Sequence, residues 1–225
     1  HMTDTIQQDR GTIDKYIGDA IMAFWGAPLK DEKHAEHALH SAMIMQKQVK
    51  EIGPEFIKRG WPKLEIGVGL NCGMMNVGDM GSTFRRAYTV LGDAVNLAAR
   101  LEGLTKEYGV GILVSENIVN AVPSVIYREL DRVRVKGKLE PISIYEPIGQ
   151  QGEVANQLLE EIDRFHRVLD RFRGQRWDEA EASLTKLIEA DPKRKVYRLY
   201  MDRIAALRST PPGTQWDGVF TFTTK

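Results

Sequence analysis

The chain has 225 residues, of which 42% are apolar, and Lys plus Arg and Asp plus Glu both total 31. This composition supports a packed core and argues against global disorder, and the length suits one full domain with a smaller appendage. The zero net charge removes the basic footprint typical of nucleic-acid-binding proteins. The single cysteine excludes a disulfide framework and indicates a reducing compartment, and no apolar run approaches the roughly 20 residues of a membrane helix.

The chain opens with a predicted β-hairpin. His1-Met2 has the character of a cloning remnant, and residues 3–10 are predicted to end a helix. Two apolar runs, 12–17 and 20–25, flank the tight turn at Gly18-Asp19, which predicts two paired strands. Asp19 at the tip is either an ordinary turn residue or an oxygen ligand held ready for a hard cation such as Mg²⁺.

A helix is predicted next, over residues 31–52, with Gly53-Pro54 closing it. Three histidines, at 34, 37 and 40, are spaced so that they do not all lie on one face of this helix. Because no carboxylate or cysteine completes a ligand set with them, they are interpreted as surface or packing residues. Cys72 is predicted to fill a strand face rather than act as a nucleophile, because no partnering histidine is evident in the sequence.

The middle of the chain mixes short strands and helices. Glycines in the segment 64–73 indicate close approach of another backbone or a ligand. Strands are predicted at 64–73, 85–91, 112–114, 125–135 and 142–147, helices at 93–106 and 115–121, and a loop at 78–82. Sequential hairpins among helices predict an α+β domain with a mostly antiparallel sheet.

The last third of the chain changes character. Residues 153–208 are helical and poor in strands, and residues 177–192 resemble one tetratricopeptide-type unit, a helix pair ended by Pro192. One such unit cannot bury its own apolar face, so it is expected to pack on the preceding domain or on a partner. Residues 216–222 alternate like an edge strand.

Polar residues stand out on the helix that follows the 85–91 strand. Asn96 and Arg100 are four residues apart and therefore project from one face. Such a pair suits phosphate oxygens and a sugar, or it belongs to an ordinary solvated face. Lys136 and Lys138 at a strand end equally suit a phosphate or a simple basic turn.

Four blocks, residues 14–24, 67–73, 88–100 and 135–138, occur in the order and at the spacing of one known family. The sequence resembles the catalytic domain of the class III nucleotidyl cyclases, in the bacterial adenylate cyclase branch. The resemblance spans residues ~12 to 147 and implies a ferredoxin-like α+β fold with a mostly antiparallel sheet and flanking helices. It also implies a lyase that converts ATP into 3′,5′-cyclic AMP and pyrophosphate for intracellular signalling.

The resemblance also implies residue roles. Asp19 would be the second of two metal-binding aspartates, for two Mg²⁺ or Mn²⁺ ions per site. Lys15 and Thr89 would read the adenine, where guanylate-specific relatives typically carry Glu and often Cys. Further roles fall to Asn96 for the ribose, Arg100 for the reacting phosphate and Lys136 for the terminal phosphates. Because the family builds its site between two head-to-tail domains, Lys15 and Asp19 would serve two different active sites of a C2 homodimer.

The chain departs from the family at its start, since the family's first strand and first metal aspartate precede the hairpin. Asp4, Asp9 and Asp14 lie outside the expected strand and are given no metal role. The expected domains are therefore an incomplete catalytic domain over 3–150, a helical segment over 151–210 and an extended tail over 211–225. Little or no cyclase activity is expected from these 225 residues alone.

The C-terminal part resembles the tails of membrane-anchored bacterial cyclases that carry an extracytoplasmic sensor. This implies a cytoplasmic domain of a longer protein whose sensor and membrane region lie upstream. The alternative is a non-catalytic cyclase-like module for dimerisation or partner binding. A diguanylate cyclase is disfavoured, because its Gly-Gly-acidic-acidic-Phe signature is missing.

Overall fold

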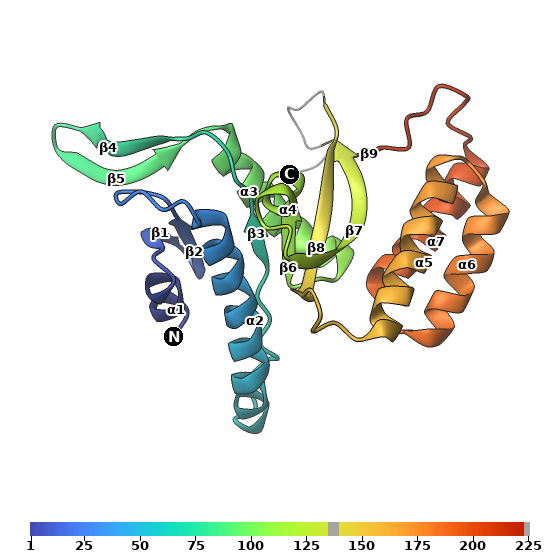
Figure 1. Ribbon diagram of the computed structural model, residues 1–225, viewed down its shortest axis with the longest axis horizontal. Helices are drawn as coiled ribbons and strands as arrows, with labels where there is room; N and C mark the ends of the chain where they lie inside the picture. Colours follow the sequence, from blue (N-terminus) through green and yellow to red (C-terminus); the bar gives the residue numbers. More distant parts are fainter. Residues whose placement is uncertain (135–139, 223–225) are drawn as a thin grey trace. The chain divides into compact units, whose positions relative to one another are not determined.

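The computed structural model describes residues 1–134 and 140–222, apart from the side chain of Arg85. Helices and strand hairpins are mixed along the chain in an α+β fold, as the sequence predicts (Figure 1). The chain forms two compact units. The first contains His1–Gly103 and Gly111–Val122, and the second contains Leu104–Val110 and Pro123–Lys225.

Two antiparallel hairpins lie in the first unit, after the short helix α1 (Met2–Gln8). Strands β1 (Thr12–Ile17) and β2 (Ala20–Phe24) form the predicted opening hairpin, and Gly18 takes a φ of 64° at its turn. Strands β4 (Asn76–Ser82) and β5 (Arg85–Leu91) form a second, longer hairpin (Figure 1). The predicted loop at 78–82 is therefore wrong. These residues pair along their whole length with β5, and their exposed, glycine-rich sequence lacks the apolar alternation that marks a strand.

Helix α2 (His34–Lys58) buries the predicted apolar stripe, which includes Ala38, Leu39 and Ala42. The prediction that Gly53-Pro54 ends the helix is wrong, because both residues lie inside it. The helix stops one turn later, where Gly60 takes a φ of 75° and its N–H bonds the Ile57 carbonyl. A glycine in this left-handed conformation is a common end of a helix.

Strand β3 (Val68–Leu70) pairs in parallel with β6 (Ile112–Ser115), which precedes helix α4 (Glu116–Ala121). The strand is shorter than the predicted 64–73, because the Gln46 side chain, rather than a strand ladder, bonds the Ile66 carbonyl at 2.9 Å. The predicted close approach is confirmed at Gly69. A Cβ there would lie 2.2 Å from the Ala98 carbonyl oxygen on helix α3 (Asp93–Tyr108).

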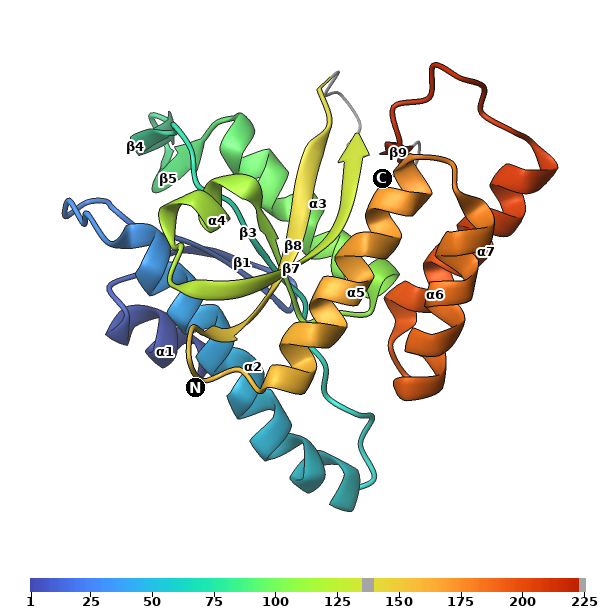
Figure 2. The ribbon, with the colours of Figure 1, turned by 45° about the vertical axis from the view of Figure 1, so that its right-hand side comes forward.

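The second unit contains the antiparallel pair β7 (Val125–Arg134) and β8 (Ile142–Gln150). The short strand β9 (Phe220–Thr221) adds in parallel to β7, within the predicted edge strand. Three helices fill the predicted helical stretch and lie side by side in Figure 2: α5 (Asn156–Arg173), α6 (Trp177–Ala190) and α7 (Lys195–Ser209). Helix α6 ends immediately before Asp191-Pro192, where the sequence places the stop.

Helices α5 and α7 of the second unit contact strand β7, and α6 packs against both helices. The fully buried Arg128 of β7 pairs with Glu161 of α5 at 2.8 Å and with Glu146 of β8 at 2.5 Å. Tyr200 of α7 donates its hydroxyl to the Leu130 carbonyl at 2.9 Å. Across the part of the chain that the structure describes, no helix has both the length and the apolar character needed to span a bilayer.

Candidate active site

The two predicted base-reading residues lie side by side. Lys15 of β1 donates from Nζ to Thr89 Oγ1 of β5 at 3.4 Å, although the residues are 74 positions apart. The Lys15 side chain keeps 46% of its surface exposed, whereas Thr89 is nearly buried. The contact between β1 and β5 therefore presents an ammonium group and a hydroxyl group together at the edge of the first unit.

A third residue, Asp14, completes this cluster, and sequence reasoning gave it no role. Its side chain is fully buried. Thr89 Oγ1 donates to Asp14 Oδ2 at 2.5 Å, and the Val90 backbone N–H donates to the same oxygen at 3.4 Å. The other oxygen, Oδ1, lies 3.2 Å from Lys15 Nζ as an ion pair but outside hydrogen-bond geometry.

A β-bulge explains how neighbouring residues reach the same target. Ile13 pairs with Ala23 and Lys15 with Met22, so Asp14 is the extra residue of strand β1. In a regular strand, residues 14 and 15 would point to opposite faces. A bulge redirects side chains locally, and here both Asp14 and Lys15 contact Thr89. A sequence pattern read with a strict period of two cannot reveal this.

The other predicted site residues of the first unit are open to solvent or partly so. Asp19 is exposed at the turn between β1 and β2, and on α3 Asn96 is exposed and Arg100 is half-buried, one helical turn further on. Within the described residues, the structure records no hydrogen bond or ion pair to these three side chains. They are therefore available to a ligand. Lys136 lies outside the described residues.

Helix α3 is held by contacts from residues 69 and 71. Asn71 Nδ2 donates to the Ala94 carbonyl at 3.0 Å, and Ser115 Oγ of β6 donates to Asn71 Oδ1 at 2.6 Å. Together with the backbone contact at Gly69, this bridge sets the position of the helix that carries Asn96 and Arg100. The segment 69–71 therefore helps to hold helix α3 in place.

A metal ion at this site would find one suitable carboxylate. Asp19 is an exposed oxygen donor on a tight turn, which fits a hard cation. Among the described residues, no group of three or more His, Cys, Asp or Glu side chains is arranged to hold a metal. The described chain thus fits the metal through Asp19, with the remaining oxygen ligands to come from elsewhere, including the phosphates of a nucleotide.

The three histidines of α2 have partners, as packing residues do. His37 Nδ1 lies 2.7 Å from Asp31 Oδ2, and His40 Nδ1 lies 2.8 Å from Asp9 Oδ2.

The premise that Cys72 has no histidine nearby is wrong, since His34 Nε2 lies 3.2 Å from Cys72 Sγ. Cys72 also lies just beyond β3 rather than within it. Burial nevertheless raises the pKa of the Cys72 thiol, which disfavours the nucleophilic thiolate.

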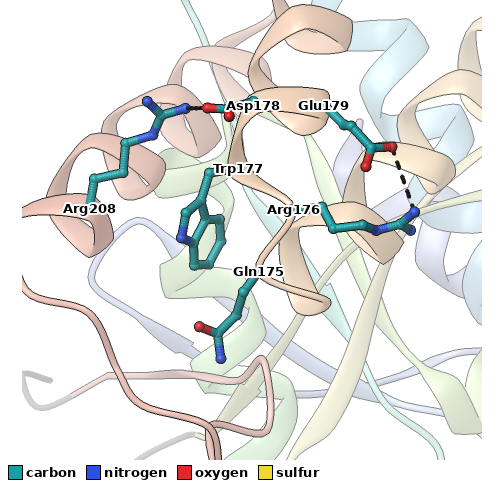
Figure 3. Close-up of a pocket in the computed structure, with 6 residues that line it drawn as sticks. All are labelled: Gln175, Arg176, Trp177, Asp178, Glu179 and Arg208. Carbon is teal, nitrogen blue, oxygen red and sulfur yellow. Dashed lines mark hydrogen bonds and ion pairs between the residues drawn. The ribbon is translucent and has the colours of Figure 1, made fainter.

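A separate pocket of about 420 Å³ lies in the second unit. Figure 3 shows its lining, formed by Gln175, Arg176, Trp177, Asp178, Glu179 and Arg208. Its charged groups pair with one another: Arg208 Nη2 lies 2.6 Å from Asp178 Oδ1, and Arg176 pairs with Glu179 at 3.6 Å. None of the predicted site residues is among the six, so the pocket has no part in the candidate active site.

Comparisons with known proteins agree with this arrangement. A family model for the adenylate and guanylate cyclase catalytic domain matches residues 2–146. The adenylate cyclase of Anabaena cylindrica is 43% identical over 153 residues, which are 64% of this chain and 30% of that protein. The guanylyl cyclase Cya2 has a TM-score of 0.61 at 34% identity, over 69% of this chain and 78% of that one. The adenylyl cyclase CyaB from P. aeruginosa has the same TM-score at 30% identity, over 68% and 80%.

The chain therefore belongs to the adenylate and guanylate cyclase catalytic domain family, the class III nucleotidyl cyclases. The resemblance noted in the sequence and the α+β fold class are both confirmed. The family is an enzyme family, and its members similar to this chain include adenylate cyclases. Because both an adenylyl and a guanylyl cyclase are among the similar structures, membership alone does not decide which purine is used.

Proposed function

We propose that this chain is the catalytic domain of an adenylate cyclase, which converts ATP into 3′,5′-cyclic AMP and pyrophosphate. The observation that carries the proposal is the contact of Lys15 Nζ with Thr89 Oγ1 at 3.4 Å. It supports a purine-reading pair, because the family resemblance assigns these two positions to the base and the fold brings them together. The chain spans only 30% of the Anabaena cylindrica relative, so the activity of the whole protein is part of the proposal.

The chemistry of this pair favours adenine. Adenine presents a ring nitrogen, N1, that accepts a hydrogen bond, and a 6-amino group that donates. Lys15 can only donate, which suits N1, and a Thr89 hydroxyl that accepts suits the 6-amino group. Guanine reverses both groups, with an N1–H that donates and a 6-oxo group that accepts. Lys15 therefore meets a repelling N1–H in GTP, where a Glu in its place would accept from it.

The remaining residues act on the ribose and the phosphates. Asn96 orients the ribose, and Arg100 balances the negative charge that develops on the reacting phosphate. Lys136 would hold the terminal phosphates. Asp19 would hold Mg²⁺ or Mn²⁺, which, when bound, lowers the barrier to attack by the ribose 3′-hydroxyl and neutralises the pyrophosphate leaving group.

A homodimer is part of the proposed function. Several large apolar side chains are exposed on the two hairpins of the first unit. Exposed apolar patches of this kind commonly mark protein–protein interaction sites. The exposed side chains are Tyr16, Ile17, Val77, Phe84 and Leu91. These residues support an interface in which the Asp19 of one copy and the base-reading pair of the other serve the same site. The two-fold repeat of that arrangement gives two equivalent sites.

The proposal also covers the activity of these 225 residues by themselves. Asp19 alone among the assigned residues supplies a metal carboxylate, and one carboxylate holds a divalent cation weakly. We therefore expect the 225-residue chain to show little cyclase activity unless a further carboxylate is supplied. The proposed setting is the cytoplasmic side of a longer, membrane-anchored protein.

The test is an assay of purified protein with ATP and Mn²⁺, in two lengths: these 225 residues, and the same chain preceded by the upstream segment that the family resemblance implies. The longer protein should form cyclic AMP, and Asp19→Ala should reduce its rate by at least the roughly 10–100-fold that loss of a residue supporting a metal ligand costs. Asp4→Ala, an exposed aspartate on α1, is the matched control and should leave the rate unchanged. An inert longer wild type would favour the alternative, a non-catalytic module that acts by dimerisation or partner binding.

A further inference from the structure

We infer that Asp14 is a specificity-determining positioning residue: it fixes the direction of the Thr89 hydroxyl proton, so that Thr89 can only accept a hydrogen bond from the purine. The inference rests on the proposed adenine-reading role of Lys15 and Thr89, and deepens it. Asp14 itself makes no contact with the base. It acts through Thr89.

The hydrogen bonds around Asp14 leave the hydroxyl one orientation. Asp14 Oδ2 receives both the Thr89 hydroxyl, at 2.5 Å, and the Val90 N–H, at 3.4 Å. A carboxylate paired with an ammonium group only accepts hydrogen bonds, so the proton of this contact comes from Thr89. With its proton directed at Asp14, Thr89 Oγ1 has only lone pairs to offer elsewhere.

One of those lone pairs already accepts a hydrogen bond, from Lys15. Lys15 Nζ approaches Thr89 Oγ1 at 3.4 Å and can only donate, so the hydroxyl acts as donor to Asp14 and acceptor from Lys15 at once. The long Lys15 contact is the weaker of the two and the lysine is half-exposed, so the ammonium can move onto a purine N1. The freed lone pair of Thr89 then faces a 6-amino donor favourably and a 6-oxo acceptor unfavourably.

A hydroxyl without this constraint would not discriminate. It rotates to suit its partner, donating to a 6-oxo group as easily as it accepts from a 6-amino group. The burial of Asp14 makes the constraint strong, because a hydrogen bond to a charged group in a low-dielectric setting is stronger than one in water. The bulge in β1 is what allows a fully buried carboxylate and a half-exposed lysine to meet the same hydroxyl.

The natural probe is ITP, which differs from ATP at N1 and position 6 and lacks the 2-amino group of GTP. ATP and ITP are supplied together to the longer, active protein, and the ratio of cyclic AMP to cyclic IMP is read by mass spectrometry. This ratio reports relative kcat/KM and does not depend on the fraction of enzyme that is folded. Dissociation constants of the 225-residue chain for the two nucleotides give the same comparison without turnover.

Three variants separate orientation from charge and from folding. Asp14→Ala frees the hydroxyl proton, so the preference for ATP over ITP should fall by about tenfold or more, the worth of one hydrogen bond of about 1.4 kcal/mol. Asp14→Asn keeps an amide oxygen that accepts from Thr89 and Val90, so it should retain most of the preference despite the lost charge. In a Thr89→Val background, Asp14→Ala should not change the ratio further.

Asp79→Ala is the matched control, because this exposed aspartate pairs across from Tyr88, next to Thr89, without contacting the hydroxyl. It should leave the ratio at the wild-type value. The inference is overturned if Asp14→Ala lowers turnover of both nucleotides equally, or if Asp14→Asn loses the preference as fully as Ala does. A wild type with no preference for ATP over ITP would instead contradict the proposed base-reading role itself.

Discussion

The two units contain the same arrangement of three side chains in two very different settings. In the first unit, the Thr89 hydroxyl donates to Asp14 and accepts from Lys15. In the second, the Tyr108 hydroxyl donates to Asp131 Oδ2 at 2.5 Å and accepts from Arg203 at 3.3 Å. Arg203 also donates to Asp131 at 2.5 Å.

The two clusters differ in access to solvent. Lys15 is half-exposed, whereas the Arg203 side chain is 7% exposed and lies 4.0 Å above the Phe220 ring. Burial, followed by the charge of Asp131, holds the pKa of Tyr108 well above its usual value, so this hydroxyl stays protonated. The first cluster can therefore exchange one of its bonds for a ligand, while the second is buried and stabilises the packing of α7 on β7. Exposure of the cation is therefore what distinguishes the proposed base-reading cluster from the buried one.

The largest effect is expected from Asp131→Ala. This change leaves the Arg203 guanidinium buried without its carboxylate, which should lower the free energy of unfolding by about 3–5 kcal/mol. Urea unfolding followed by circular dichroism measures it. The control, Asp217→Ala, removes a partly exposed ion pair to Arg134 and the hydrogen bond from the Val219 N–H, and should cost less, about 1 kcal/mol. Equal losses in both variants would mean that the buried cluster is no more stabilising than a surface pair.

Removing the hydroxyl group from Tyr108 and from Thr89 should have smaller effects, and the two effects should differ in kind. Tyr108→Phe removes the hydrogen bonds of the Tyr108 hydroxyl with Asp131 and Arg203. It should cost about 1–3 kcal/mol of stability and leave the ATP-to-ITP product ratio unchanged. Thr89→Val should lower that product ratio. A change in nucleotide preference with Tyr108→Phe would show that the second cluster contributes to base selection. That result would contradict the assignment of base reading to the first cluster and stability to the second.

The smallest effect is a pH dependence in the second unit. Burial lowers the pKa of His166 below its usual value near 6.5, and its Nε2 accepts the Glu129 backbone N–H at 2.9 Å, which requires the neutral ring. The unfolded chain therefore binds this proton more readily than the folded chain. The stabilisation should be fully present above about pH 6.5 and should decline as the pH falls toward the lowered pKa.

The measurement for His166 is urea unfolding at pH 8 and at pH 5.5, followed by tryptophan fluorescence. His166→Gln supplies an amide oxygen that can accept from Glu129 and does not titrate. Its loss of stability between the two pH values should be smaller than that of the wild type, since all other titrating groups are shared. Identical losses in both proteins would exclude His166 as a source of the pH dependence.

The sequence predicted what depends on local patterns. The opening hairpin and the helix that carries Asn96 and Arg100 followed from turn chemistry and helical spacing. The resemblance to the family assigned Lys15 and Thr89 to the same base, and the structure places them in contact. Gly69 was predicted as a point of close approach and is one. These features depend on residue types at fixed spacing, which a sequence displays directly.

The missed features depend on register and on tertiary context. Asp14 escaped notice because its role comes from a bulge, and one extra residue in a strand leaves no mark in the apolar pattern. The contact of His34 with Cys72 joins residues 38 positions apart. Strand β4 was missed because an exposed hairpin is held by its ladder of backbone hydrogen bonds rather than by a buried face.

The choice of purine is the central claim, and a competition between ATP and GTP tests it most directly. The longer protein proposed above is given both nucleotides at equal concentration with Mn²⁺, and the two cyclic products are quantified in the same sample. Lys15 and a Thr89 held as acceptor by Asp14 predict that cyclic AMP is the dominant product. Dominant cyclic GMP, or equal amounts of the two, would contradict the account.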